Sequence, residues 1–503
     1  MMYRTIFKVF LGIALCAALA GCTVGGYPIK KDELKAANDK DAVAITRDQE
    51  EVSGPLTLEE AMARVIKYNL DYRIKLMEED LSIKQYDLTT YDLLPRLMAD
   101  TGWTRRDRYN ASSSLSVLTL RESLEPSTSQ DKSHYNADLV VAWNLLDFGV
   151  SYYQTKQQAD RFYVSKERRR KALQAIMQQV RLAYWQAVGV QQLEDRFPLL
   201  MKQVEAALKE SADSEIEKLK APIEALTYRK TLLDLLRQLE SLQDELVQAK
   251  PRLAALMNLP PGGQFKLAPP SSMELPQLKA GLESMEQHAL LKRPEIMEAH
   301  LQERISANET KKAIVRLFPG FELSLGKHYD SNSFLYYDSW VEGGVKITWN
   351  LINLMSGKTQ YNIARSQEEI TKAGTLALNM AVLTQVHVAY RDFESRKRQY
   401  TRALEMQDID MRILEQTQNA VTSGAQNRLN EIRAAAGALM AEYRKYQNYA
   451  ALQNSYGQML VTLGYDPVPE NIDRKDLKEL AGDLRKSTEV MPLLEMPGTL
   501  EKK

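Results

Sequence analysis

The 503-residue chain repeats part of itself at a fixed spacing, and this duplication constrains its fold more than any other feature. A Trp-Asn-Leu-Leu sequence begins at Trp143, and Trp-Asn-Leu-Ile follows at Trp349, 206 positions later. A hexapeptide beginning at Gln179 returns at Gln385 with the same offset. An offset that holds over so long a stretch predicts two similar structural units that act together.

An earlier segment repeats with a second offset. Leu58 and Pro95 correspond to Leu282 and Pro319, 224 positions further on. The two offsets differ by 18 positions, which predicts an insertion in the first unit, within the Ser-, Arg- and Asp-rich stretch 105–132. We expect a longer surface loop in the first unit than in the second.

Between these prolines and tryptophans, apolar residues alternate with polar or small ones. The alternation covers 97–103, 135–143, 321–326 and 341–349. It predicts four strands of about ten residues, paired as two hairpins. This length, with aromatic residues near the strand ends, is typical of strands that cross a membrane. The same alternation also fits a half-buried sheet on a soluble domain.

Helical patterns dominate the rest of the chain. Thr57 and Glu60 form a capping-box pattern at the start of a helix that we expect to continue to Pro95. Tyr184, Trp185 and Tyr390 are expected to pack between helices.

Each hairpin is followed by a long stretch with a single internal glycine, at 149–213 and at 358–423. We expect helices of roughly sixty residues there, about 90–100 Å in length. Each would return along the chain, over 219–258 and 425–464. Helices of this length predict a coiled coil or a helical tube.

The N-terminal segment has the features of a bacterial secretion signal. Arg4 and Lys8 are followed by an apolar run over 10–20 and then by Leu-Ala-Gly-Cys, which ends at Cys22. This sequence resembles the bacterial lipobox, whose cysteine is acylated and becomes the first residue of the mature protein. A signal peptide with a chance cysteine, or a simple membrane anchor, is the alternative. The only other cysteine is Cys16, so the body of the chain can hold no disulfide, zinc-thiolate site or thiol catalyst.

Composition and motifs argue against several other functions. The formal net charge is zero, which gives no long-range attraction to nucleic acid. No stretch after residue 22 is apolar for long enough to form a transmembrane helix. A Gly-rich phosphate loop and a nucleophile elbow are both missing, and the five histidines lack ligand spacing, so we expect no enzyme, metal or cofactor. These histidines are His134, His288, His300, His328 and His387.

Four membrane-crossing strands cannot close on themselves. An open sheet edge in lipid leaves backbone groups unsatisfied, at several kcal/mol each. A dimer would supply eight strands and a trimer twelve. Twelve strands leave a lumen, whereas eight fill with side chains. The strands therefore predict that several copies assemble, but they do not determine the number of subunits.

The order of these features resembles the TolC-like outer-membrane efflux protein family, particularly its lipoprotein members. A lipobox, a helix, Leu-Pro, a hairpin, Trp-Asn-Leu-Leu-Asp-Phe-Gly and a long helical hairpin follow one another, and everything after the lipobox is repeated. The resemblance covers roughly 56–465. It implies a mainly α fold with a β-barrel portion, in which duplicated units form a trimeric 12-stranded barrel continued by a periplasmic α-helical barrel. The chain divides into a lipoprotein signal peptide (1–21), a lipidated tether (22–55), a first repeat (56–258), a linker (259–281), a second repeat (282–465) and a polar C-terminal tail (466–503).

The same resemblance implies a passive channel in the outer membrane of a Gram-negative bacterium. The protein would be the exit duct of a tripartite efflux or type I secretion system. Its partners would be two further copies of itself, outer-membrane lipids, a periplasmic adaptor protein and an inner-membrane transporter. A structural coiled-coil lipoprotein that scaffolds an envelope complex without conducting is the alternative, although a pure scaffold needs no membrane-length strands.

The resemblance also places candidate sites at the helical tips. In this family the second helical hairpin carries a tip glycine, which Gly424 matches, and glycine suits a chain reversal because it adopts positive φ without strain. Ser423, Gly424 and Ala425 are therefore candidates for contact with the adaptor. A helix-terminating turn without a partner is the alternative. The first tip falls, by the 206-residue offset, on a stretch without glycine: Lys218, Leu219 and Lys220.

Some members of the family line their periplasmic constriction with acidic rings, six and nine positions after the tip glycine. Asn430 and Arg433 occupy these positions, and their first-repeat counterparts are Glu224 and Thr227. The acidic ring is therefore not preserved. Three copies of Arg433 would form a cationic ring that favours anions, unless Glu224 or Glu431 pairs with each arginine. A solvated arginine on a helix face is the alternative.

Overall fold

The computed structural model describes residues 28–47, 49–123, 125–216, 222–260, 262–269, 273–278, 280–466 and 475–490. The expected signal peptide, Cys22 and the first tip (Lys218, Leu219 and Lys220) lie outside these residues. The chain forms two compact units, Met1–Glu51 and Val52–Lys503.

The first unit contains helix α2 (Lys31–Thr46), whose described side chains are exposed. The sequence predicts only a polar tether in this region. The stretch has no glycine or proline, and the Glu33 carboxylate accepts the Lys30 N–H at 3.2 Å, which stabilises the first turn.

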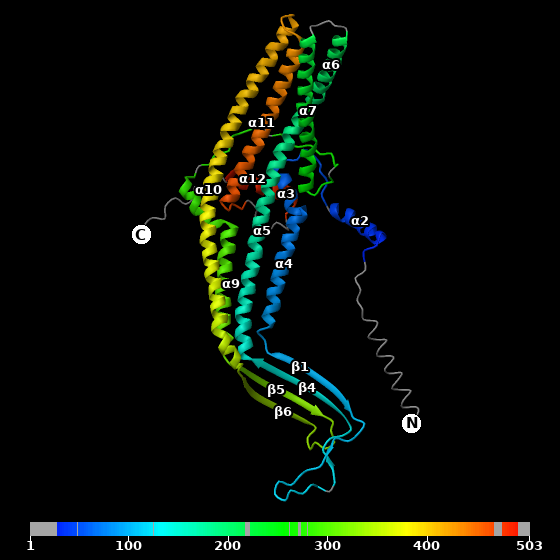
Figure 1. Ribbon diagram of the computed structural model, residues 1–503, viewed down its shortest axis with the longest axis vertical. Coiled ribbons are helices and arrows are strands. Elements are labelled where there is room, and N and C mark those ends of the chain that lie inside the picture. The colour runs from blue at the N-terminus through cyan, green and yellow to red at the C-terminus, as the bar shows by residue number, and fades with distance from the viewer. Residues whose placement is uncertain are drawn as a thin grey trace. The chain divides into compact units, whose positions relative to one another are not determined.

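The second unit contains both repeats (Figure 1). The first repeat consists of α3 (Leu58–Tyr68), α4 (Leu70–Tyr91), β1 (Arg96–Arg105), β4 (Ser133–Asn144), α5 (Leu145–Leu193), α6 (Arg196–Ile216) and α7 (Pro222–Leu256). The second consists of α8 (Leu282–Lys292), α9 (Pro294–Val315), β5 (Gly320–Asp330), β6 (Ser339–Thr348), α10 (Leu351–Thr422) and α11 (Arg428–Thr462). The duplication read from the sequence is therefore present in the order of the elements.

The element boundaries reproduce both offsets. Helices α3 and α4 and strand β1 begin 224 positions before α8, α9 and β5, and β4 and α5 begin 206 positions before β6 and α10. The change of offset falls in the loop that joins β1 to β4, where the first repeat carries the small hairpin of β2 (Ala111–Ser112) and β3 (Ser127–Thr128). The expected longer surface loop is confirmed.

The helix start at Thr57 is confirmed, but the expected single helix up to Pro95 is wrong. The Thr57 hydroxyl accepts the Glu60 N–H at 3.2 Å, and the Glu60 carboxylate accepts the Thr57 N–H at 2.8 Å. The helix then ends, because the Asn69 side chain accepts the Tyr72 N–H and begins α4 as a new helix. The second repeat breaks at the matching place, where Pro294 is the first residue of α9.

The expected long helix is confirmed in the second repeat and wrong in the first. Helix α10 continues for 72 residues. Helix α5 ends after 49 residues, and α6 begins only after a turn at 194–195. The cause is Pro198, which the expectation of one continuous, proline-free helix overlooked. Proline lacks an N–H, and its ring clashes with the carbonyl four residues earlier, here that of Glu194.

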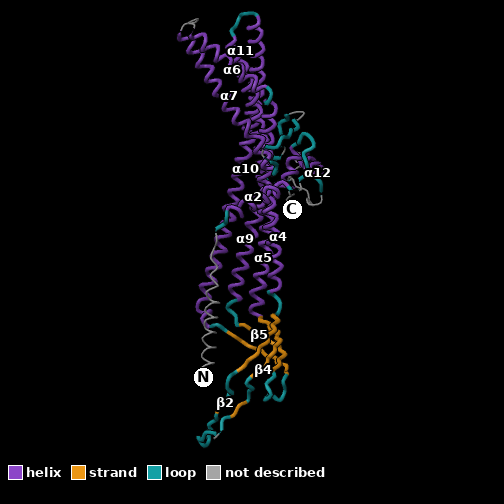
Figure 2. Tube along the Cα trace, turned by 90° about the vertical axis from the view of Figure 1, so that its right-hand side faces the viewer, coloured by secondary structure: helices purple, strands orange, loops and turns teal. Residues whose placement is uncertain are grey.

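The four long strands form one antiparallel sheet in the order β1-β4-β5-β6. The two predicted hairpins are β1–β4 and β5–β6, and β4 pairs with β5 to join the repeats. Figure 1 shows the sheet at one end of the bundle of α4, α5, α9 and α10, with the α6–α7 and α10–α11 hairpins at the other end. Short loops connect helices to strands (Figure 2), except that α5 follows β4 directly.

The main hydrophobic core lies where helices of both repeats meet, between the sheet and the helical tips. Tyr184 and Trp185 are buried there, and Trp185 packs edge-on against Tyr449 with ring centroids 4.8 Å apart. The Tyr184 hydroxyl can donate to the carbonyl of Leu56, at 3.1 Å, or to that of Ala268, at 2.7 Å. This contact attaches the segment between the repeats to α5, and burial raises the pKa of the Tyr184 hydroxyl. Tyr390 lies half-buried against a second cluster, as expected.

The C-terminal region differs from the expected polar tail. Residues 477–490 form helix α12 (Leu477–Val490), which packs on α3. Leu477, Leu480, Ala481 and Leu484 are buried in the main core.

Candidate channel wall and helical tips

One face of the sheet collects apolar and aromatic side chains from all four strands. Directly opposed residues share a face, and the register places Leu97 opposite Val141, which in turn lies opposite Leu325. Many of these side chains are exposed, with Val345 at 70% and Leu97 at 68%. Lys327 also lies on this face, between Leu139 and Val341. Such an exposed face requires a covering medium or partner. Its larger apolar members are Leu97, Trp103, Tyr135, Leu139, Val141, Trp143, Phe321, Leu323, Leu325, Tyr329, Val341, Val345 and Ile347.

The opposite face of the sheet is polar, and histidine–aspartate pairs join the two repeats across it. His134 Nδ1 lies 2.9 Å from Asp330 Oδ1, and His328 Nδ1 lies 2.7 Å from Asp138 Oδ1. The Trp340 ring stacks on His328 with centroids 5.3 Å apart. Strands β4 and β5 each contribute one histidine and one aspartate, so the two pairs link β4 to β5 in both directions. Spacing along one strand could not reveal this arrangement, because the register between strands decides it.

The two outer strands of this sheet have free edges. Among the described residues, β1 pairs only with β4, and β6 pairs only with β5. Each therefore presents a row of backbone N–H and C=O groups to whatever lies beside it. An apolar face with open edges is not a complete wall by itself.

The loop between β1 and β4 is held at its base and ends in an apolar tip. The buried Asn332 side chain accepts the Asp131 N–H and donates to the Ser129 carbonyl, both at 3.0 Å. Val117 and Leu118, at the end of this loop, are 89% and 95% exposed.

The turn between α10 and α11 contains the three tip candidates. Gly424 has φ = +74°, as its predicted role in the reversal requires. The Ala425 N–H donates to the Ala420 carbonyl at 2.8 Å, and the Gly424 N–H donates to the Val421 carbonyl at 3.0 Å. These are the two bonds of a Schellman motif, which satisfies the last carbonyls of α10. Ser423, Gly424 and Ala425 are all exposed and available to a partner.

The four constriction candidates lie near this tip, on α7 and α11. Glu224 and Thr227 are exposed on α7, and the Thr227 hydroxyl donates to the Ile223 carbonyl at 2.7 Å. The Asn430 N–H donates to the Asn427 side chain at 3.1 Å as part of the cap of α11. Arg433 is exposed, and its guanidinium donates to the Thr231 hydroxyl at 3.1 Å. In the described part of the chain, Arg433 forms no ion pair with Glu224 or Glu431.

Other residues at the tip were missed from the sequence. Arg428 lies 3.1 Å from Glu210 and so links the start of α11 to α6. Asn427 is an N-cap residue three positions before Asn430, a local pattern that the sequence did contain. The Arg428–Glu210 pair has no such local signal, because it joins residues 218 positions apart. The structure thus brings the two helical hairpins together at this end.

The elbow between α8 and α9 carries a charged cluster. The Arg293 guanidinium lies 3.3 Å from the Glu295 carboxylate and donates to the Gln385 side chain of α10 at 2.6 Å. Lys171 of α5 lies 3.5 Å from the same carboxylate. Burial raises the pKa of Glu295, but Arg293, a backbone hydrogen bond and Lys171 together outweigh burial and hold that pKa below the usual range for glutamate. The cluster ties α5, α9 and α10 together.

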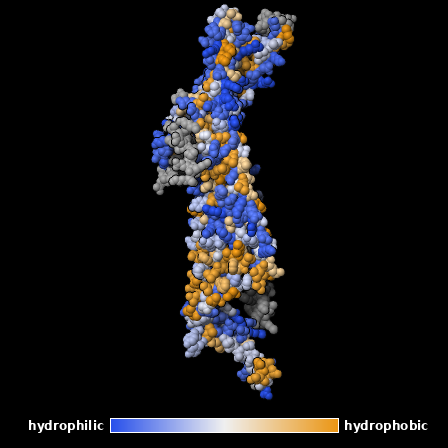
Figure 3. Space-filling view, turned by 90° about the vertical axis from the view of Figure 1, so that its left-hand side faces the viewer, coloured by the Kyte–Doolittle hydropathy of each residue, from blue (hydrophilic) through white to orange (hydrophobic). Residues whose placement is uncertain are grey.

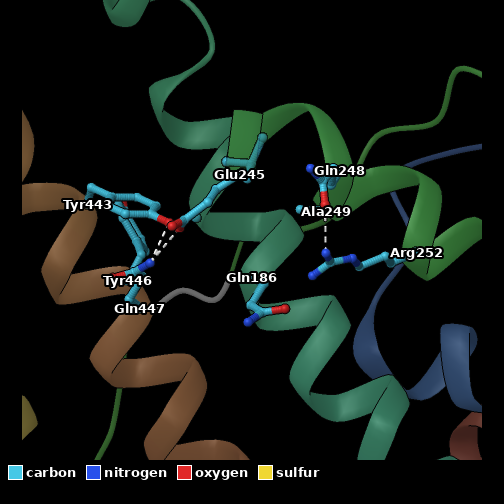
Figure 4. A pocket seen from close by; sticks show the side chains of 10 residues that line it. Gln186, Glu245, Gln248, Ala249, Arg252, Tyr443, Tyr446 and Gln447 are labelled. Carbon is cyan, nitrogen blue, oxygen red and sulfur yellow. Dashed lines mark hydrogen bonds between the residues drawn. The ribbon is translucent and has the colours of Figure 1, made fainter. Parts of the chain in front are cut away.

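A cavity of about 310 Å³ lies among α5, α7 and α11 (Figure 4). The Tyr443 hydroxyl donates to the Glu245 carboxylate, and the Gln447 side chain donates to the same carboxylate at 2.9 Å. Arg252 donates to Gln248 at 2.6 Å. These polar groups pair with one another and connect α7 with α11. The arrangement is that of helix packing, without a nucleophile or a phosphate cradle.

The described residues hold no group of three or more His, Cys, Asp or Glu placed to bind a metal ion. None of the described helices combines the length and the apolar character needed to cross a bilayer.

Comparison with solved structures identifies the fold. The outer-membrane channel CmeC of Campylobacter jejuni matches with a TM-score of 0.65 at 12% identity, covering 88% of this chain and 94% of that one. The open state of the Neisseria gonorrhoeae MtrE outer-membrane channel matches with a TM-score of 0.62 at 17% identity, over 81% of this chain and 89% of that one. CusC, described for its transmembrane channel formation, matches with a TM-score of 0.62 at 16% identity, over 83% and 96%.

This chain has the fold of these outer-membrane channels. The resemblance to TolC-like proteins that the sequence suggested is thereby confirmed at the level of the fold, together with its mainly helical architecture. No protein-family model matches the sequence, and no curated protein sequence matches it.

Proposed function

We propose that the protein is a passive channel-tunnel in the outer membrane of a Gram-negative bacterium. It would be the exit duct of a tripartite efflux or type I secretion system, anchored by a lipid at Cys22 and extending into the periplasm. One observation carries the proposal: a sheet of membrane-length strands, with one exposed apolar face and two unpaired edges, continues into long helices.

The unpaired edges support a trimer. In lipid, every backbone polar group must be satisfied within the protein, so the edges of β1 and β6 must pair with other copies. Three copies supply twelve strands, which enclose a lumen, whereas eight strands would fill with side chains. The polar face with the histidine–aspartate pairs then lines the lumen, and the apolar face contacts lipid.

The helical tips suit a periplasmic partner. Ser423, Gly424 and Ala425 are exposed at the end of the α10–α11 hairpin, and we assign them to contact with an adaptor protein that connects the duct to an inner-membrane transporter. Lys218, Leu219 and Lys220 would complete this contact from the first hairpin. Glu224, Thr227, Asn430 and Arg433 would surround the constriction at the same end.

A non-conducting scaffold is the competing function. Long helices would serve such a scaffold equally well, but the exposed apolar face of the sheet would then remain in water. Burying apolar surface is worth about 25 cal/mol per Å², so leaving this face in water is unfavourable.

The test compares two neighbouring positions on β5 that lie on opposite faces. Leu325→Arg places a charge on the proposed lipid face, which costs about 2–4 kcal/mol near the bilayer midplane, whereas Ser324→Arg places it in the proposed lumen. We expect the unaltered protein and Ser324→Arg to insert into planar bilayers and conduct, and Leu325→Arg to lose insertion.

Mass measurement in detergent gives the number of subunits in the same preparations. A stable monomer, or a trimer that inserts without conducting, would contradict the proposed function. Equal effects of the two arginine substitutions would contradict the assignment of the two faces.

A further inference from the structure

The contact between the two repeats of one chain provides a template for the contact between chains. Helix α5 of the first repeat packs on α9 of the second. At the centre of this contact the Gln157 side chain donates to the Ile305 carbonyl at 2.9 Å, and Lys312 donates to the Gln157 side chain at 3.1 Å. At the end of these helices that meets the sheet, β4 pairs with β5.

The strands and the helices next to them correspond position by position in the two repeats, so the contact inside one chain predicts the contact between copies. Arg96 pairs with Ala142 in the first hairpin, and Gly320 pairs with Thr348 in the second. These two pairs are related by the same offsets of 224 and 206 positions that relate the element boundaries. In a closed ring, α10 and β6 must therefore meet α4 and β1 of the next copy as α5 and β4 meet α9 and β5 within one chain.

The exposure of matching positions supports this transfer. Four positions at the contact inside the chain are buried, at 2–8% exposure, and their counterparts in the other repeat are apolar and 55–68% exposed. The matched pairs are Gln157 with Ile363, Val164 with Ile370, Ile305 with Leu81, and Lys312 with Leu88. An apolar surface that is exposed in one chain is what a contact with another copy would cover.

The chemistry of the two contacts differs. Gln157 and Lys312 are polar, whereas their counterparts Ile363 and Leu88 are apolar. Ile363 and Ile370 are seven residues apart on α10, as Leu81 and Leu88 are on α4, which is the spacing of a coiled-coil seam. Apolar surface gathers on the α10 side of the second unit, around the junction of helices and sheet (Figure 3).

We propose that neighbouring subunits meet through a dry apolar seam between α10 of one copy and α4 of the next, continued by pairing of β6 with β1 in one defined register. The proposal rests on the trimeric channel proposed above. Inside the chain, Leu139 lies opposite Lys327 and Val141 opposite Leu325. The offsets transfer these pairs to Val345 opposite Trp103 and Ile347 opposite Thr101 of the next copy.

Disulfide cross-linking of the full chain tests the register. Directly opposed residues on antiparallel strands have Cα atoms about 4.5–5.5 Å apart, within the range that a disulfide spans. We expect Ile347→Cys/Thr101→Cys to form a covalently closed trimer on oxidation. The body of the chain has no cysteine of its own, so the unaltered protein and the two single variants serve as controls.

A register control uses the same face of the same strands. Ile347→Cys/Leu97→Cys shifts the pair by four residues, roughly 13 Å along β1, and should not cross-link. Cross-linking of the shifted pair, or a trimer without cross-linking of the Thr101 pair, would overturn the register while leaving the channel proposal intact. Absence of a trimer by mass would instead contradict the proposed function.

A double-mutant cycle tests the helical seam. Leu88→Lys buries a charge between subunits, and we expect it to raise the subunit dissociation constant in detergent at least tenfold, whereas Leu118→Lys at the exposed loop tip should not change it. Ile363→Gln/Leu88→Lys copies the Gln157–Lys312 pair, so the double variant should dissociate less than the two single effects predict. Unchanged dissociation in Leu88→Lys, or strictly additive effects, would overturn the assigned contact.

Discussion

Two glycines with positive φ end the two longest helices of the second repeat, and they have different surroundings. Gly424, after α10, faces open space. Gly464, after α11, has φ = +72°, and a Cβ at this position would come within 2.6 Å of the Arg293 backbone nitrogen. Glycine at 464 therefore allows the end of α11 to press against the elbow between α8 and α9.

Gly464→Ala should destabilise the protein, because it combines a left-handed backbone with a clash against backbone atoms. We expect a loss of at least about 1–2 kcal/mol in the free energy of unfolding. Gly437→Ala is the matched control inside α11, where a Cβ would meet nothing within 4 Å, and it should gain about 0.5–1 kcal/mol. Thermal unfolding followed by circular dichroism compares the two, and similar shifts for both would contradict the role of Gly464.

At the scale of elements, helix ends depend on single residues. Asn69 separates α3 from α4, and Pro198 separates α5 from α6. Helix α12, in contrast, has a pattern that extends over the whole element. Its apolar residues at 477, 480, 481 and 484 follow helical spacing, so the helix could have been recognised from the sequence. The polar outer face and the prolines around it hid this pattern.

Leu480→Ala should release α12 from α3. Leu480 is fully buried, and truncating a buried leucine costs about 2–5 kcal/mol, which is enough to free a helix of 14 residues. We expect faster tryptic cleavage at Arg485 and Lys486. Gly482→Ala, where a Cβ would meet nothing within 4 Å, should slow this cleavage by favouring the helix. Unchanged cleavage in Leu480→Ala would show that α12 is held by other contacts.

At the scale of the whole molecule, three copies would place each exposed residue of the tip region in a ring. Arg433 is exposed and bonded to a neutral hydroxyl, so its charge is not cancelled by a carboxylate among the described residues. A ring of such charges attracts anions and repels cations in a narrow passage.

Arg433→Asp should shift the ion preference of the proposed channel from anions toward cations. The reversal potential in planar bilayers under a salt gradient measures this preference. Arg433→Lys keeps the charge and should leave the preference unchanged. A reversal potential that is the same in the aspartate variant and the unaltered protein would show that Arg433 lies outside the conducting path.

The sequence by itself determined the features that depend on residues close together in the chain. Alternation revealed the strands, Thr57 and Glu60 revealed a helix start, and Gly424 revealed the reversal at the tip. The duplication revealed the repeated order of elements, because a repeated unit keeps its local patterns.

Only the tertiary structure decided how distant residues meet. The His134–Asp330 and His328–Asp138 pairs join strands nearly two hundred residues apart, and their register has no local signal. The same holds for the polar contact between α5 and α9, whose apolar counterparts lie exposed on α10 and α4. Local patterns are set by backbone geometry over a few residues, whereas these contacts depend on which surfaces the packed helices and strands bring together.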